Sequence, residues 1–288
     1  MTAVKGTTSA HRDGGRPGAG ADSGLRALIV TIYGLYAREV GGWLGVSTII
    51  RLMAQLEVDE PAVRSSISRL KRRGILEPER IDGRAGYTLS AQARDILDAG
   101  DRRIFGRRRG TVDEGWVLAV FSVPESERGR RHTLRSRLSW LGFGSVGPGV
   151  WVAPAHLHDE AREMLLREEL AEYVDLFQAT YLGFSAAAEE VARWWDLEGL
   201  DELYEQFCTE HAPVLARWRS RRGKDDPGLA FADYVRVLTA WRRLPYLDPG
   251  LAPELLPRDW SGARAADLFF ALRRRLEDPS RRFVDEVR

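Results

Sequence analysis

The chain has 288 residues, of which 44% are hydrophobic, and its formal net charge is only +1. This length exceeds the roughly 100–150 residues of a typical domain, so we expect two or three domains with packed cores. Cys208 is the one cysteine, which excludes a disulfide framework or a cysteine-based metal cluster, and the absence of an apolar run of about 18 residues excludes a transmembrane helix.

The net charge hides an asymmetry along the chain. Of the 43 Lys and Arg residues, 19 lie within residues 1–110, together with 12 of the 42 Asp and Glu residues, so the rest of the chain carries 24 basic and 30 acidic side chains. A basic front and an acidic back indicate that a polyanion binds the front of the chain only. Residues 1–22 are rich in Gly, Ala, Ser and Thr and lack an apolar signal-peptide core, so we expect a disordered tail on a cytoplasmic protein.

Three short helices are predicted after this tail. The first spans 23–40, the second begins at Ser47 and ends near residue 56, and the third spans 59–74. Three helices at this spacing, with a basic third helix, form the helix-turn-helix pattern.

The third helix carries the strongest functional signal. Val63, Ile67 and Leu70 form one apolar stripe, and at about 100° per residue the opposite side is polar and cationic. Arginine can fork onto guanine and serine can donate to phosphate, so this side suits DNA. The alternative is a solvated helix in an arginine-rich chain. We assign to DNA binding Arg64, Ser65, Ser68, Arg69, Lys71 and Arg72.

A β-hairpin is predicted directly after this helix. Residues 75–81 and 87–89 read as strands around a turn that begins at Asp82, and a further helix runs to about residue 105. A two-stranded ribbon in this place is the wing of a winged helix, and Arg80 and Arg84 are its candidate phosphate contacts. We therefore expect a winged-helix DNA-binding domain at 23–105 and a linker at 106–114.

The middle of the chain, 115–184, has the order βαββαβ, which is the ferredoxin-like arrangement. Two other patterns in it were weighed. Gly142, Gly144 and Gly147 match G-x-G-x-x-G, but a helix precedes them and a strand follows, so a dinucleotide site is not expected. His156 and His158 lack further metal ligands nearby, so no metal site is expected either.

Residues 185–288 are almost entirely helical and rich in tryptophan and arginine. The tryptophans are expected to form a core, and their surfaces also suit a flat acyl or aryl ligand or a dimer seam. The sequence carries no G-x-S-x-G, Walker A or H-E-x-x-H motif, so we expect no catalytic residues and no cofactor.

Four segments of the sequence resemble the PaaX-type repressors, which regulate bacterial phenylacetate degradation and related aromatic catabolism. They are GGWLGVSTIIRLM with EPAVRSSISRLKRRGIL, GYTLSAQARDIL, WVLAVFSVPESERGRRHTLRSRLSWLGFGSVGPGVWVAP and YLDPGLAPELLPRDWSG. The resemblance implies an α+β protein with an N-terminal winged helix-turn-helix, a central ferredoxin-like (Cas2-like) domain and a C-terminal helical domain. It also implies a homodimer on a palindromic DNA operator, released by an acyl- or aryl-CoA effector, typically phenylacetyl-CoA. It does not identify the effector-binding residues.

The resulting interpretation is a DNA-binding transcriptional repressor without a membrane partner. Two alternatives stay open. The first is a ferredoxin-like, metal-dependent nuclease with a DNA-binding head, for which Asp113 and Glu114 are the only candidate acidic site. The second is a DNA-binding adaptor whose DNA binding does not depend on a small-molecule effector.

Overall fold

The computed structural model describes residues 18–38, 41–106, 108–221 and 226–288, and the chain divides into two compact units after Ser90. Residues 1–17 of the predicted tail lie outside the described residues. In the described part of the chain, no helix is both long and apolar enough to cross a membrane. The expected fold class, α+β with a helical C-terminal part, is confirmed.

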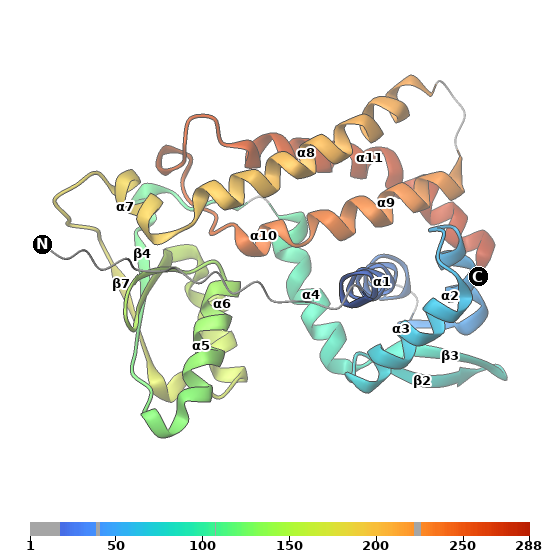
Figure 1. Ribbon diagram of the computed structural model, residues 1–288, viewed down its shortest axis with the longest axis horizontal. Helices are drawn as coiled ribbons and strands as arrows, with labels where there is room; N and C mark the ends of the chain where they lie inside the picture. The colour runs from blue at the N-terminus through green and yellow to red at the C-terminus, as the bar shows by residue number, and fades with distance from the viewer. Residues whose placement is uncertain (1–17, 39–40, 107, 222–225) are drawn as a thin grey trace, which may run out of the picture. The chain divides into compact units, whose positions relative to one another are not determined.

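The first unit is a three-helix cluster with a small sheet. Its helices are α1 (Gly18–Ile32), α2 (Val46–Ala54) and α3 (Glu60–Arg72), and its strands are β1 (Trp43–Gly45), β2 (Leu76–Ile81) and β3 (Arg84–Leu89). The sheet is antiparallel with the order β1-β3-β2. The hairpin β2–β3 extends away from the helices (Figure 1).

The core of this unit joins the helices to the sheet. Ile29, Leu52 and Val63 come from the three helices, and each is essentially inaccessible to solvent. The Tyr33 hydroxyl donates to the Tyr87 carbonyl oxygen at 2.9 Å, which fixes the end of the first helix to β3.

Two local features differ from the sequence expectation. The first helix changes to a π-helical turn, Tyr33–Ala37, in which the Arg38 N–H donates to the Tyr33 carbonyl five residues earlier. Gly34 lies in this turn, where its weak helical preference favours a departure from α geometry. Trp43 and Leu44, between the first two predicted helices, form the strand β1, which was not predicted, because they pair with Thr88 and Tyr87 of β3 far along the chain.

The second unit begins with α4 (Ala91–Phe105) and contains the four-stranded sheet. Its order is β4 (Trp116–Phe121), α5 (Arg128–Trp140), β5 (Gly144–Gly147), β6 (Val150–Pro154), α6 (His158–Arg167) and β7 (Val174–Ala179). The strands are antiparallel in the order β5-β6-β4-β7. This is the predicted ferredoxin-like βαββαβ topology.

The two faces of this sheet are covered by different elements. Val117 and Ala119 face a core that includes Leu134 and Leu138 of α5. Trp116 and Val152 face a second core, with α7 (Ala187–Trp194) and the segment after Gly250. Figure 1 shows α5 and α6 side by side over the sheet.

The C-terminal part is a helical layer. Helices α8 (Leu197–Ser220), α9 (Pro227–Trp241) and α11 (Ser261–Val287) lie along one another, and α10 (Leu244–Leu247) follows α9 (Figure 1). The last helix, α11, continues through Pro279 to Val287. That proline is buried, as are Ser280 and Val284 beyond it, so packing offsets the roughly 3 kcal/mol that an internal proline costs.

Candidate nucleic-acid interface and ligand pocket

Helix α3 has well-defined ends. The Asp59 side chain accepts a hydrogen bond from the Ala62 N–H at 2.8 Å, so Asp59 caps the helix as expected. At the other end Gly74 has φ +67°, and the Ile75 N–H donates to the Leu70 carbonyl at 3.0 Å. This pairing is the Schellman stop that glycine favours. Both ends of α3 are therefore fixed by hydrogen bonds within one turn of the helix.

The outward face of α3 has a centre and two margins. Val63, Ser66, Ile67 and Leu70 are buried. Opposite them lie Ser65, Ser68 and Arg72, all exposed, which we call the α3 outer face.

The other three predicted DNA-binding residues of α3 lie away from the centre of this face, and two of them interact within the chain. Arg64, at one margin, forms an ion pair with Glu60 at 2.7 Å, one turn earlier, and both side chains are more than half exposed. Arg69, at the other margin, is half-buried and interacts within the chain, and Lys71 is exposed nearer to the buried side. This surface is therefore not purely cationic, because Glu60 places a carboxylate at its N-terminal end.

Arg80 and Arg84 lie on different faces of the hairpin. In the register Arg80 is opposite Ala85, and Ile81 is opposite Arg84. Because successive residues of a strand point to opposite faces, these neighbouring rungs direct the two arginines to opposite sides. Both are exposed. Any phosphate contacts of Arg80 and Arg84 would therefore lie on opposite sides of the hairpin.

The Trp43 side chain contacts both strands of the hairpin β2–β3, and this contact was not predicted from the sequence. Its indole N–H donates to the Glu79 carbonyl at 3.3 Å, and a Cβ at Gly86 would lie only 2.4 Å from the indole ring. The ring therefore packs flat over β3 where only glycine fits. A glycine within a strand often marks a close approach of this kind, so Gly86 could have indicated it.

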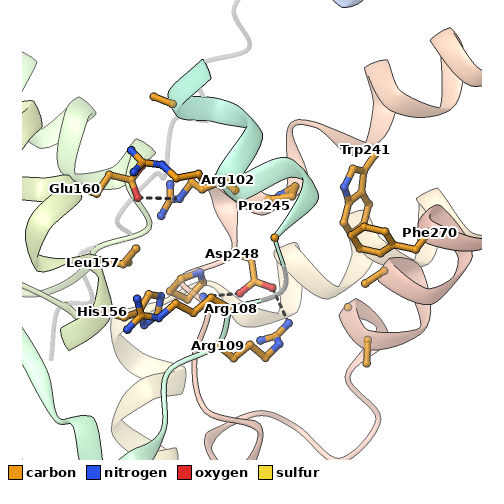
Figure 2. A pocket seen from close by; sticks show the side chains of 18 of the residues that line it. Arg102, Arg108, Arg109, His156, Leu157, Glu160, Trp241, Pro245, Asp248 and Phe270 are labelled. Carbon is orange, nitrogen blue, oxygen red and sulfur yellow. Dashed lines mark hydrogen bonds and ion pairs between the residues drawn. The ribbon is translucent and has the colours of Figure 1, made fainter. Parts of the chain in front are cut away.

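A second candidate site lies in the second unit. A pocket of about 580 Å³ is bounded by α4, residues 106, 108 and 109, the start of α6 and the helices of the C-terminal part. Figure 2 shows His156 and Arg108 on one side of it and Trp241 and Phe270 on the other. The pocket thus joins a polar side, where arginines and carboxylates are mixed, to an aromatic side.

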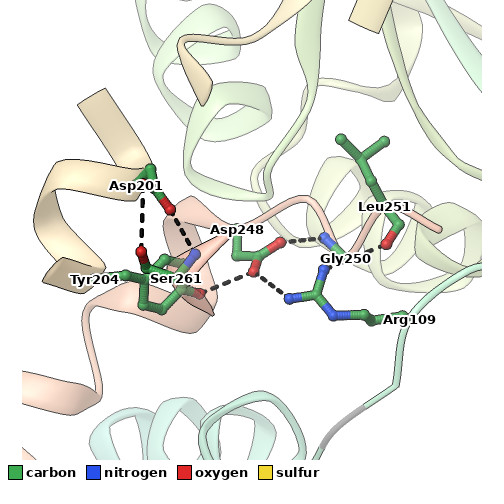
Figure 3. Close-up of polar contacts among 7 residues, drawn as sticks. All are labelled: Arg109, Asp201, Tyr204, Asp248, Gly250, Leu251 and Ser261. Carbon is green, nitrogen blue, oxygen red and sulfur yellow. Dashed lines mark hydrogen bonds and ion pairs between the residues drawn. The ribbon is translucent and has the colours of Figure 1, made fainter. Parts of the chain in front are cut away.

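Asp248 is the main polar anchor of this pocket. Its carboxylate accepts hydrogen bonds from Arg109 at 2.9 Å, from the Tyr204 hydroxyl at 2.8 Å and from the Gly250 N–H at 2.8 Å (Figure 3). Burial, followed by the neighbouring Asp248 charge, raises the pKa of Tyr204 well above its usual value. Arg109 also donates to the Leu251 carbonyl at 3.3 Å. This network ties the segment before β4 to the loop after α10.

His156 lies in the pocket wall with an unused nitrogen. It is half-buried, and its Nδ1 has no hydrogen-bond partner among the described residues. Burial, and then the charge of Arg108, lowers the pKa of His156 to about 4, so the imidazole is neutral at physiological pH. A buried polar atom without a partner is rare in proteins and is available to a ligand.

The arginines of the pocket are not equivalent. Arg103 is buried and pairs with Glu160 at 3.3 Å, so its role is structural. Arg102 is exposed, and Arg108 is 70% exposed with only a long contact of 3.9 Å to Glu114. Arg102 and Arg108 are therefore the cations best able to meet an anionic ligand.

The patterns weighed as catalytic or metal sites have structural roles. Glu114, one of the two acidic residues considered for a nuclease site, forms a capping box with Thr111, whose backbone N–H donates to the Glu114 carboxylate at 3.2 Å. Gly144 lies under the Trp195 ring, and the Trp195 indole donates to the Gly142 carbonyl at 2.8 Å. Among the residues that the structure describes, no group of three His, Cys, Asp or Glu side chains is arranged to hold a metal ion.

Comparisons with known proteins cover nearly the whole chain. Three family descriptions match in succession: "PaaX-like protein" at residues 25–93, "PaaX protein central Cas2-like domain" at 109–191 and "PaaX-like protein C-terminal domain" at 195–286. The transcriptional repressor PaaX of Escherichia coli strain K12 is 27% identical over 266 residues, which are 90% of this chain and 83% of that protein. The fold resembles an uncharacterized protein from Mycobacterium tuberculosis, with a TM-score of 0.60, 23% identity, and coverage of 91% of this chain and 99% of the other.

Proposed function

Because the chain belongs to the PaaX family, we propose that it is a DNA-binding transcriptional repressor that reads its operator with α3. The observation that carries the proposal is the α3 outer face, where Ser65, Ser68 and Arg72 are exposed on a helix whose other side is buried. Such a side chain set donates to base edges and phosphates in a major groove.

The complete DNA-binding surface in this proposal includes the margins and the hairpin. Arg64, Arg69 and Lys71 flank the outer face, and Arg80 and Arg84 contact phosphates on either side of the hairpin. We propose a homodimer, in which two such heads reach successive major grooves of a palindromic operator about 34–36 Å apart.

The test is operator binding by the full chain, with the DNA upstream of its own coding region as the probe. Arg72→Ala is expected to weaken binding by roughly 5- to 160-fold, the effect of about 1–3 kcal/mol that a base contact provides. Arg219→Ala is the matched control, because Arg219 is an exposed arginine on α8, outside the proposed interface. Equal affinities of the Arg72 variant and the wild-type protein would exclude α3 as the recognition helix.

We further propose that the pocket of the second unit takes an acyl- or aryl-CoA effector that releases the protein from DNA. Two features support this proposal: Arg102 and Arg108 suit the phosphates of such a ligand, and Trp241 with Phe270 suits a flat acyl group. To reduce operator affinity 100-fold, the effector must prefer the released state by about 2.7 kcal/mol.

A panel of acyl-CoA and aryl-CoA thioesters, with free CoA as the control, tests this effector proposal. A bound ligand raises the unfolding temperature and, if it is an effector, also lowers operator affinity. Arg108→Ala is expected to weaken both responses. A flat response across the panel would favour the adaptor alternative and leave the DNA-binding proposal intact.

A further inference from the structure

Helix α5 carries five arginines, and the structure divides them into two groups. Arg137 pairs with Glu168 at 3.1 Å, Arg130 lies 4.0 Å from Glu169, and Arg131 pairs with Glu125 at 3.0 Å. These three arginines are neutralised by acids of the same domain.

The second group consists of Arg128 and Arg135, with His132 between them. All three side chains are exposed and make no hydrogen bond or ion pair with any residue that the structure describes. At about 100° per residue they lie within roughly 40–60° of one another, so they form one stripe along the helix, which we call the α5 basic stripe. Ser139 continues the stripe by one turn.

A hollow opens beside this stripe. Its volume is about 560 Å³, and Arg135, Arg131, Ser122 and Ser145 lie at its wall. Apolar residues, Phe121, Val123 and Trp151, complete the lining beside them. The turn between β5 and β6 also borders it. Gly149 in this turn has φ +75°, and a Cβ there would lie 2.7 Å from the Phe121 carbonyl oxygen, so the turn stays close to β4 and carries no bulky side chain into the hollow.

The polar side chains of the α5 basic stripe and of the hollow suit an extended polyanion. Two unpaired guanidinium groups supply charge, and a neighbouring imidazole and the serine hydroxyls can donate hydrogen bonds to phosphate oxygens. From Arg128 to Arg135 the helix rises about 10 Å, which corresponds to about three nucleotides of one DNA strand. The stripe has no large apolar side chain that would anchor a protein partner.

We propose that the α5 basic stripe and the adjoining hollow bind the sugar–phosphate backbone of double-stranded DNA, as a second contact separate from α3. Arg135 and the serine hydroxyls hold a phosphate at the hollow, and Arg128 and His132 follow the strand. This inference rests on the proposed DNA-binding function for the identity of the polyanion, but not on α3 being the recognition helix.

The experiment compares two double variants of the full chain that remove the same charge from the same helix. Arg128→Ala/Arg135→Ala removes the free arginines, and Arg130→Ala/Arg137→Ala removes arginines that are paired with Glu168 and Glu169. Binding to a 40-base-pair duplex of mixed sequence is measured by fluorescence anisotropy over a series of KCl concentrations. The first variant is expected to lose 5- to 30-fold in affinity, and its slope of log K against log[KCl] is expected to decrease by about 1–2. The second is expected to change less than 2-fold.

An Arg72→Ala variant in the same assay separates this inference from the proposed function. If the Arg72 variant binds like the wild-type protein while Arg128→Ala/Arg135→Ala binds weakly, the α5 inference is supported and the role of α3 is not. If only the Arg72 variant is weakened, or if the two double variants behave alike, the α5 inference is overturned.

A competition experiment with inorganic phosphate at constant ionic strength completes the test. Displacement of DNA by 10 mM phosphate from the wild-type protein, but not from the Arg128/Arg135 variant, would overturn the DNA assignment in favour of a small-anion site. Equal, weak competition in both proteins supports a contact with an extended backbone.

Discussion

The Arg109 guanidinium lies 2.9 Å from the carboxylate of Asp248, 139 residues later in the chain. The Asp248 side chain is only 8% exposed, and it also accepts hydrogen bonds from Tyr204 and from the Gly250 backbone. One buried carboxylate therefore connects the segment that leads into β4 with α8 and the loop after α10. Its removal leaves a partly buried arginine without its counter-charge.

Replacing Asp248 by Asn is expected to lower the free energy of unfolding of the second unit by about 2–4 kcal/mol. The amide keeps the shape of the side chain but loses the charge that Arg109 and Tyr204 require. Urea denaturation followed by tryptophan fluorescence measures this loss. Asp159→Asn is the control, because the Asp159 side chain is 92% exposed and its removal is expected to change stability by less than about 0.5 kcal/mol. Similar losses in both variants would contradict a special role for Asp248.

Gly86→Ala is expected to destabilise the first unit by about 1–3 kcal/mol, because the new methyl group would overlap the Trp43 ring. Hydrogen exchange of the hairpin amides measures this local effect. In a Trp43→Ala background the same substitution is expected to cost less, because the ring is gone, but not to become neutral, because the Leu44 carbonyl oxygen still lies 2.5 Å from the added Cβ. Additive effects of the two changes would refute the packing of Gly86 against the ring. Gly24→Ala, where no atom lies within 4 Å of the added Cβ, is the control.

The features that could be predicted from sequence are those whose cause is local. The ends of α3 follow from Asp59 and Gly74, whose capping chemistry involves residues within one helical turn. The βαββαβ order follows from alternating patterns along 115–184 and is confirmed by the strand order. The assignment of Ser65, Ser68 and Arg72 to DNA remains a prediction.

The features that were missed depend on residues far apart in the chain. Strand β1 exists because Trp43 and its neighbours pair with β3 across more than 40 residues, and no local pattern of Trp43 to Gly45 encodes that partner. The pocket was missed for the same reason, since Arg108, His156 and Phe270 come from three distant segments. The split of the α5 arginines into paired and free groups likewise required the position of α6 and the turn after it.

Arg103 and Arg102 are adjacent in α4, and we expect substitution of Arg103, but not of Arg102, to lower the free energy of unfolding. The Arg103 side chain is 11% exposed, donates to the Leu141 carbonyl at 2.7 Å and lies over the Tyr246 ring at 5.4 Å. Arg103→Ala should therefore cost about 2–4 kcal/mol of unfolding free energy, because Glu160 and that carbonyl lose their partner. Arg102→Ala should stay within about 0.5 kcal/mol of the wild-type value, since the side chain is exposed. Thermal and urea unfolding of the two single variants compare them directly, and equal costs would contradict the structural role of Arg103.

His156→Gln tests the neutral imidazole in the pocket wall through the pH dependence of stability. The pKa of His156 is about 4 in the folded protein, below the usual 6.5, so between these values the unfolded chain binds more protons than the folded one. Stability contributed by the neutral ring is therefore complete above pH 6.5 and is lost as the pH falls towards 4. Burial is the largest cause, Arg108 and Arg103 act in the same direction, and Glu114 and Asp248 oppose it.

Because His156 is only half-buried, we expect the wild-type protein to lose about 1–2 kcal/mol more than His156→Gln between pH 6.5 and 4. Urea unfolding at four pH values across this window measures the difference. His211, whose pKa is also lowered by burial, titrates in both proteins, so its contribution cancels in the comparison. Parallel stability curves for the two proteins would show that His156 is protonated in the folded state as readily as in the unfolded chain.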